Sequence, residues 1–327
     1  MATAPTGTTV SSGPGVTHET EDLSDVIARI DPSEVPVYSN LSKGTATSIK
    51  HEWTVQELLA VDGTNRKNEG FEPDYETLKV PNRMDNYTQI SSRAGIVSGT
   101  YDAVDTVGGS DRESTRQKVM KGLELRRDLE LIVTQHQAKS GADPRAMGAI
   151  PSWISNAVVE GASTVPTGDG SDVSDLAGTD VAFASIAKVD AALLMAHLDG
   201  GKPKTLNMSP KLKTDWSKIP DATAGAGSIY VTKPDTSGSQ FTFHGASDAY
   251  HSDWGAVEVV SSIHMQKGLI LALDPNYIKA CALPGRNFAA KDIAVTGDSR
   301  RFMVVYEGTI EATAPKAHAM AVDLIDA

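Results

Sequence analysis

Imidazole and carboxylate side chains gather in one segment of the sequence, residues 243–255 (FHGASDAYHSDWG). Its residues with useful chemistry are His244, Asp248, His251 and Asp253. Such groups can coordinate zinc or transfer protons as general acids and bases. Their spacing fits no metal-binding motif, and a Gly- and Ser-rich loop between two strands explains the same composition. We therefore expect a plain loop here and keep hydrolytic chemistry as an alternative.

Two further patterns could carry catalysis or nucleotide binding. Ser185 and Lys188 match the SxxK motif of penicillin-recognising enzymes, but the SDN-like and KTG-like elements that those enzymes also need are absent from the sequence. The glycine pairs at 168–170 and 225–227 lack the strand–GxGxxG–helix context and the Walker A lysine of nucleotide sites. We expect neither pattern to form an active site.

The remaining isolated signals have simple explanations. Asn40, Asn86 and Asn207 begin glycosylation sequons, but no secretion signal accompanies them. Cys281 is the single cysteine, which excludes an intramolecular disulfide framework, a four-cysteine zinc site and a CxxC redox pair. Flanked by alanines in an expected strand, it is predicted to be a small buried apolar group. We predict no catalytic residue, no metal and no cofactor.

The composition is that of a folded acidic chain. Its 327 residues include 42 Asp and Glu against 30 Lys and Arg, a formal net charge of −12. A protein that reads DNA sequence would show a basic stripe, and none is present. The longest purely apolar run, 269–273, is far too short to span a bilayer. We therefore expect a soluble protein of the cytoplasm, or of a structure assembled there, with no membrane partner.

The first hundred residues divide into an arm and a projecting pair of strands. Residues 1–21 are rich in Thr, Ser, Gly, Pro and Ala, so we expect disorder or ordering against a partner. A short helix is predicted at 22–30. Strand-forming segments at 48–58 and 88–97 flank a long polar stretch, which predicts a hairpin that projects from any core. A plain surface loop is the alternative.

The clearest element is a helix predicted over residues 110–140. Ser110 and Glu113 have the spacing of a capping box, and Gly141 is placed to end the helix. At about 1.5 Å per residue this helix would be roughly 45 Å long, so we expect it to lie across a sheet. Its apolar face carries Val119, Gly122, Leu125, Leu129, Ile132 and Val133.

Basic residues also occur along this helix among acidic ones. They are Arg112, Arg116, Lys118, Lys121, Arg126 and Arg127. The simplest interpretation is a solvated face with ion pairs at helical spacing. The alternative is contact with phosphate or with a neighbouring subunit.

The rest of the chain mixes helices and strands. Helices are predicted at 180–198, ended by Gly200-Gly201, and from Pro210 to about 219, capped by Ser209. Short strands are predicted at 204–208, 228–232, 240–243, 257–261, 269–273, 277–283 and 292–296, and a long one at 302–313. This order of elements is typical of an α+β protein.

Five segments, taken together, resemble a known family. They are 22–27 (DLSDVI), 30–37 (IDPSEVPV), 51–53 (HEW), 146–154 (AMGAIPSWI) and 297–301 (GDSRR). Over roughly residues 22–320 the chain is similar to the major head proteins of tailed bacteriophages, in particular those of some short-tailed phages with elongated heads. Val35 stands where the family usually has threonine. The resemblance implies an α+β chain with the Hong Kong 97-type capsid fold.

The resemblance also implies a domain division. The expected parts are an N-terminal arm at 1–44, an extended loop at 45–108, a peripheral domain at 109–178 completed by strands near 286–314, an axial domain at 179–285 and a C-terminal segment at 315–327. The residues expected at subunit interfaces are Trp53, Arg66, Lys67, Glu69, Arg83, Arg93, Arg112, Arg116, Arg126 and Arg127.

The implied function is structural rather than enzymatic. The resemblance implies a major capsid protein that self-assembles into pentamers and hexamers of an icosahedral or elongated head. The head would enclose double-stranded DNA without sequence-specific binding. Portal, scaffold or cement proteins are the further partners that it implies, and the expected location is the virion, assembled in the host cytoplasm.

Two alternatives remain open. A tail-tube or head-decoration protein would usually be smaller and more purely β. A soluble hydrolase using His251 and Asp253 would need a concave pocket with perturbed titratable groups. Since only about 21 flexible residues precede the first expected helix, we expect no large segment to be cleaved from the N-terminus. Lysine–asparagine cross-links occur in a few relatives of the family, but no local motif marks such partners here.

Overall fold

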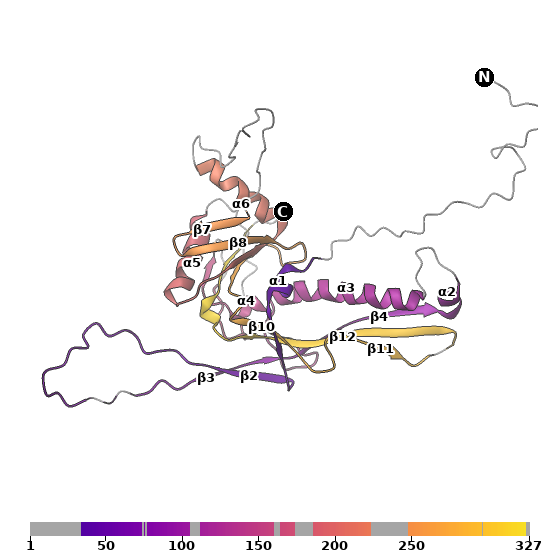
Figure 1. Cartoon of the computed structure of the whole chain (residues 1–327), viewed down its shortest axis with the longest axis horizontal. Coiled ribbons are helices and arrows are strands. Elements are labelled where there is room, and N and C mark those ends of the chain that lie inside the picture. Colours follow the sequence, from indigo (N-terminus) through magenta and orange to yellow (C-terminus); the bar gives the residue numbers. More distant parts are fainter. Residues whose placement is uncertain are drawn as a thin grey trace, which may run out of the picture.

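The computed structural model describes residues 34–73, 75, 77–104, 112–159, 164–173, 186–223, 248–295 and 297–324. These residues form a compact α/β domain, an elongated part built on a long strand and a long helix, and a hairpin that projects beyond both (Figure 1). The helix expected at 22–30 and the strands expected at 228–232 and 240–243 lie outside the described residues. In the described ranges no helix has both the length and the hydropathy to cross a bilayer.

The elongated part is organised around β12 (Ser299–Ala312). One edge of β12 pairs antiparallel with β4 (Gln89–Ser98) over ten residue pairs. The other edge pairs with β11 (Ala289–Ile293) and then with β10 (Ile278–Ala282), and β1 (Ser42–Thr45) joins β10 in parallel. Long strands predicted from alternation in the last third of the chain are thus confirmed, with β11 starting three residues earlier than expected.

The helix α3 (Glu113–Thr134) lies along β4 and β12 (Figure 1). Leu125, Leu129 and Val133 recur every four residues, are buried and share one core cluster with side chains of β12. Val119, predicted to lie on the same apolar face, is exposed. With 22 residues, α3 is shorter than the predicted span of 110–140 and measures roughly 33 Å.

Both predicted ends of this helix were wrong. Ser110 lies outside the described residues, and Glu113 opens the helix and pairs with Arg116 instead of acting in a capping box. At the other end the helix stops at Thr134, well before Gly141. The side-chain amide of Gln137 donates to the Met147 carbonyl oxygen at 2.7 Å. Pairing with the segment that follows therefore replaces further helical turns.

The compact domain contains a six-stranded sheet. Its order is β5 (Ala157–Val159), β13 (Ala319–Val322), β9 (Ile270–Leu273), β6 (Thr205–Met208), β8 (Gly255–Ser261) and β7 (Ala249–Ser252). Two helices, α5 (Ala187–Leu198) and α6 (Pro210–Thr223), pack on this sheet. As predicted, Ser209 precedes Pro210 and its hydroxyl accepts from the Leu212 amide, and Gly200 follows α5 with a positive φ of 84°.

The central strands of this sheet are buried on both faces. In β9, Leu271 and Leu273 belong to the core cluster that contains α3, while Ile270 and Ala272 belong to the cluster that contains α5 and α6. The same alternation occurs in β13, since successive side chains of a strand point to opposite faces. One face of the sheet therefore shares a core with α3 and β12 of the elongated part, and the other face shares a core with α5 and α6.

The two sheets draw strands from across the expected domain segments. β10 falls within the expected axial segment 179–285 but pairs with β12 in the long sheet. Conversely, β5 and β13 come from segments assigned elsewhere and complete the compact sheet. Their pairing connects residues more than a hundred positions apart, which local sequence patterns do not reveal.

The hairpin consists of β2 (Lys50–Val55) and β3 (Asn82–Tyr87). The sequence predicted that 48–58 and 88–97 would form its two strands, and this pairing was wrong, because 88–97 becomes β4 and pairs with β12. The short helices α1 (Pro36–Asn40), α2 (Gly99–Ala103) and α4 (Ile150–Trp153) and the 3-10 turn η1 (Pro315–Ala317) complete the fold.

Candidate assembly interface

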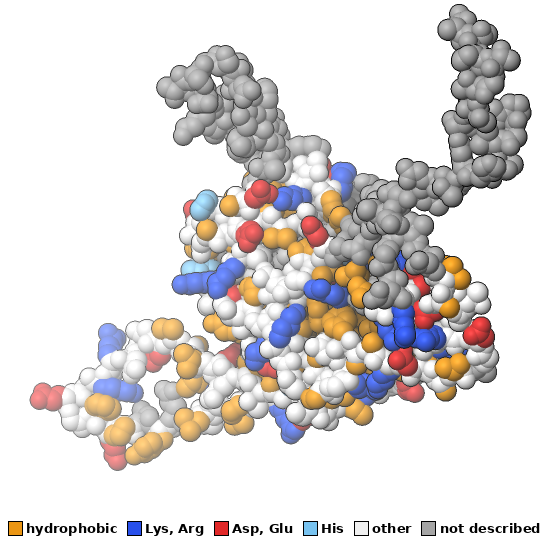
Figure 2. Space-filling view, turned by 45° about the vertical axis from the view of Figure 1, so that its right-hand side comes forward, with side chains coloured by type: hydrophobic (Ala, Val, Ile, Leu, Met, Phe, Trp, Pro, Cys, Tyr) orange, Lys and Arg blue, Asp and Glu red, His pale blue; other side chains and the backbone are white. Residues whose placement is uncertain are grey.

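The connection between β2 and β3, residues 56–81, exposes many large apolar side chains. Leu58 is 93% exposed, Tyr75 is 95% exposed and Val61 is fully exposed. Leu59, Phe71, Leu78 and Val80 are exposed as well. Figure 2 shows hydrophobic side chains gathered on this projecting hairpin, away from the body of the molecule. A patch of this kind marks a surface that becomes buried against another molecule.

The base of the hairpin, in contrast, is fixed to the body. The indole N–H of Trp53 donates to the Ala312 carbonyl oxygen at 2.9 Å, and its ring lies 5.2 Å from that of Trp153. The side chain of Asn86 is fully buried, donates to the carbonyl oxygens of Ile310 and Gly148, and accepts from the Gly148 amide at 2.8 Å. These contacts set the direction in which the hairpin leaves the body.

Ion pairs next to the base also attach the hairpin to the body. Glu57 lies 2.7 Å from the Lys316 ammonium in η1 and 2.9 Å from that of Lys79. The hydrogen bonds and charges of these two lysines lower the pKa of Glu57 to about 2. On the opposite strand, the Lys139 ammonium contacts Asp85 and lies over the Trp153 ring. These contacts fix β3 and both ends of the apolar connection, next to the base of the hairpin.

The segment that leads into the fold from the N-terminal side is held by one buried carboxylate. Glu130 of α3 is fully buried and accepts from the backbone N–H groups of Val37 and Tyr38 at 2.9 and 2.7 Å. It also accepts from the Ser262 hydroxyl at 2.7 Å. Since α1 has no capping side chain of its own, Glu130 serves as its cap. Sequence reasoning missed this residue, because a glutamate on a long helix resembles any surface acid.

The predicted interface residues fall into three groups. Arg66, Lys67 and Glu69 are exposed on the apolar connection of the hairpin. Trp53 and three arginines make contacts within the chain: Arg83 pairs with Glu52, Arg93 makes two bonds of 2.6 Å to Asp128, and Arg116 pairs with Glu113. The remaining three residues are Arg112 and Arg126, both exposed, and Arg127, half-buried.

Some of the basic residues on α3 form the ion pairs at helical spacing that the sequence predicted. Glu113 and Arg116, and Lys121 and Glu124, form ion pairs three residues apart. Lys118 reaches Asp292 of β11 at 2.7 Å. These basic side chains therefore neutralise acids of the same chain.

Among the residues first considered for catalysis, the three acids and histidines that the structure describes in this loop lie at the surface or in a surface ion pair. His251 and Asp253 are exposed around the turn that joins β7 and β8, and Asp248 pairs with Lys213. Ser185, His244 and the glycine pair at 225–227 lie outside the described residues.

The other sequence motifs have structural explanations. Gly170 takes a positive φ of 82° and lies against the Trp153 ring, where a side chain would collide. Asn86 and Asn207 are buried, so their sequons are chance matches, as expected.

Solved structures of phage capsids and of an encapsulin share this architecture. The chain aligns with the capsid asymmetric unit of cyanophage A-1(L) at a TM-score of 0.64, with 12% identity over 94% of this chain and 97% of that one. A chain from the structure of the major capsid and decoration proteins of phage G aligns at a TM-score of 0.56, with 10% identity over 94% of this chain and 98% of that one. The SrpI encapsulin of Synechococcus elongatus PCC 7942 aligns at 0.56 with 9% identity over 94% and 92%. The fold is thus the Hong Kong 97-type capsid fold.

Sequence comparison narrows this class to one family. A profile of the SU10 major capsid protein matches residues 4–324, so the chain belongs to the SU10 major capsid protein family. A 114-residue segment is 31% identical to the major capsid protein of Escherichia phage Phieco32 and spans 35% of this chain and 32% of that relative. Membership makes the chain a structural virion component whose role is to form a capsid shell.

Proposed function

We propose that this chain assembles into pentamers and hexamers that close into an icosahedral or elongated head, and that its role involves no enzymatic turnover. The observation that carries the proposal is the apolar connection of the hairpin, which is exposed in the single chain although its base is fixed. Each subunit would lay this connection over a neighbour. Ring contacts of this kind are heterologous and close by rotation.

The energetics favour many weak contacts acting together. Full burial of one large apolar side chain contributes about 1.5–3 kcal/mol. Leu58, Tyr75 and Leu78 together could therefore supply several kcal/mol per subunit contact. A shell repeats the contact in every subunit, so that many interfaces of modest strength together stabilise the assembled shell.

The test replaces Leu58, Tyr75 and Leu78 singly and together with serine in the full-length chain. Each single change should weaken subunit association roughly 10- to 100-fold, seen by sedimentation and negative-stain microscopy as free subunits in place of shells or rings. Val119→Ser is the matched control, because Val119 is 61% exposed on α3, outside the hairpin. Assembly of the triple variant at wild-type concentrations would refute the proposal.

A shell-forming role also implies partners other than copies of this chain. We propose a portal, with scaffold or cement proteins, as partners during assembly in the host cytoplasm, and packaged double-stranded DNA as the content. We also propose that the virion is that of a short-tailed phage, as the sequence resemblance implies. The net charge of −12 would keep the inner surface from adhering to DNA. Filter binding of purified shells at low salt should show negligible retention of duplex DNA, and tight retention would contradict this view.

A further inference from the structure

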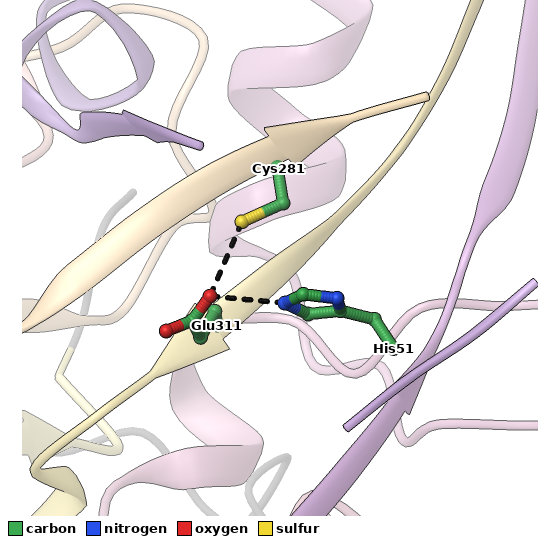
Figure 3. Close-up of side chains that lie close together, drawn as sticks. All are labelled: His51, Cys281 and Glu311. Carbon is green, nitrogen blue, oxygen red and sulfur yellow. Dashed lines mark hydrogen bonds and ion pairs between the residues drawn. The ribbon is translucent and has the colours of Figure 1, made fainter. Parts of the chain in front are cut away.

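Three metal-ligating side chains from distant parts of the sequence converge beneath the hairpin. His51 comes from β2, Cys281 from β10 and Glu311 from β12 (Figure 3). The His51 Nε2 atom lies 2.9 Å from Glu311 Oε2, and the Cys281 Sγ atom lies 3.5 Å from the same oxygen. One atom of each side chain lies within 4.8 Å of the other two. Figure 3 shows the thiol and the imidazole both turned toward the carboxylate.

The surroundings leave these three atoms turned toward one another. Lys279 contacts the other oxygen of Glu311, Oε1, at 3.0 Å, so Oε2 remains directed at the imidazole and the thiol. Gly44 lies opposite Cys281 in the β1–β10 pairing, and a Cβ at that position would come within 2.5 Å of Sγ. Glycine thus leaves room for the sulfur. Cys281 is almost fully buried, while the side chains of His51 and Glu311 keep 16% and 12% exposure.

We propose that His51 Nε2, Cys281 Sγ and Glu311 Oε2 bind one divalent transition-metal ion of the zinc class. The mixed nitrogen, sulfur and oxygen set suits zinc and is unlike the all-oxygen sets that hold magnesium or calcium. Tetrahedral zinc at its usual bond lengths separates its ligand atoms by roughly 3.3–3.7 Å. The Nε2–Oε2 and Sγ–Oε2 distances of 2.9 and 3.5 Å therefore need shifts of only a few tenths of an ångström. Nε2 and Sγ lie within 4.8 Å of each other, so their separation has to close by no more than about 1.3 Å.

Metal binding at this site replaces hydrogen bonds with metal–ligand bonds and releases protons. Binding breaks the hydrogen bonds that Glu311 makes with His51 and Cys281 and forms three metal–ligand bonds in their place. The thiol proton leaves to solvent. The proton on His51 Nε2, which bonds to Glu311, moves through solvent to Nδ1 of the neutral ring or, from a protonated ring, leaves to solvent. A thiolate, a carboxylate and a neutral imidazole then compensate a 2+ ion. A solvent molecule would complete the coordination sphere on the partly exposed side.

A metal here would join the hairpin to the long sheet. β2 belongs to the hairpin, whereas β10 and β12 are adjacent strands of the sheet. Bound metal would thus add a link to those made by Trp53 and Asn86 and slow the opening of the hairpin base. The inference concerns these three side chains alone and stands whether or not the shell proposal holds.

The experiment uses the full-length chain, stripped of metal and then titrated with Zn²⁺ or Co²⁺ alone. We expect about one ion per chain by elemental analysis, a thiolate-to-cobalt charge-transfer band, and slower hydrogen exchange of β2 amides when Zn²⁺ is present. Cys281→Ser and His51→Gln should each weaken binding more than the roughly 10- to 100-fold typical of losing an outer-shell partner. Cys281→Ser should also remove the band.

The matched control is His251→Gln, which removes an exposed histidine of β7 and should leave uptake unchanged. Circular dichroism of each variant separates loss of the site from loss of folding, and Cys281→Ala serves as a second test if the serine variant misfolds. Uptake well below one ion per chain, a missing charge-transfer band, or uptake that persists in Cys281→Ser would overturn the proposal.

Discussion

Glu130 is the residue whose replacement tests the architecture most sharply. Its carboxylate accepts from Val37, Tyr38 and Ser262, which belong to α1 and to the residue after β8. Glu130→Gln keeps the volume and one oxygen of the side chain. It removes the negative charge and places an amide NH₂ opposite one of these donors. Two donors then face each other in a site that is closed to water.

The size of the effect follows from the contacts. Hydrogen bonds to a charged group contribute about 1.5–3 kcal/mol each, and a buried donor without an acceptor costs about 1–3 kcal/mol. Since one of three bonds is lost outright and two are weakened, we expect the free energy of unfolding to fall by about 3–5 kcal/mol. For a chain of this length that corresponds to a melting temperature roughly 4–7 °C lower.

The assay combines chemical denaturation with residue-resolved hydrogen exchange at the amides of Val37 and Tyr38. Glu124→Gln is the matched control, because Glu124 lies on the same helix and pairs with Lys121 at the surface. That change should cost no more than about 0.5 kcal/mol. If Glu130→Gln stays within about 1 kcal/mol of the wild type and both amides keep their protection, Glu130 does not hold the arm and the reasoning fails.

Two more predictions follow from buried polar groups. Burial lowers the pKa of His318 to about 4, so the unfolded chain gains a proton below its ordinary pKa of 6.5 while the folded chain does not. Stability should therefore fall by up to about 3 kcal/mol between pH 6.5 and 4, and His318→Gln should flatten that part of a pH–denaturation profile. Asn86→Ala should lower stability by about 3 kcal/mol and speed exchange in the hairpin base, whereas the exposed Asn82→Ala should do neither; equal effects would refute a special role for Asn86.

Elements with complete local signals were predictable from the sequence. Ser209 followed by Pro210 marks the start of α6, and Gly200 marks the end of α5, because a cap and a positive φ depend on only a few neighbouring residues. The alternation in 302–313 predicted β12 to within a few residues. The family resemblance then supplied the architecture, which these elements alone left open.

Features that depend on distant pairing were not predictable in this way. The segment 82–87 (NRMDNY) is polar and reads as loop, yet it forms β3 because Asn86 finds buried partners in Ile310 and Gly148. Cys281 has the sequence context of a small apolar group, but β12 and β2 bring Glu311 and His51 beside it. The partner Ile310 of Asn86 and the neighbour His51 of Cys281 both lie more than two hundred residues away, beyond the reach of any local pattern.

The two regions of the hairpin have different roles in stability. The base is stabilised by contacts within the chain, whereas the connection at residues 56–81 is expected to be stabilised only when subunits assemble. The base is ordered within one chain by Trp53, Asn86 and Asp85, so association need not supply the free energy of fixing the hairpin direction. The large apolar side chains of the connection are exposed in the single chain, so the free energy of burying them remains available for subunit contact. Loosening the base by Asn86→Ala should therefore weaken assembly even with every apolar side chain intact. Changing Leu58 or Tyr75 should weaken assembly while the exchange of β2 and β3 amides in free subunits stays as in the wild type.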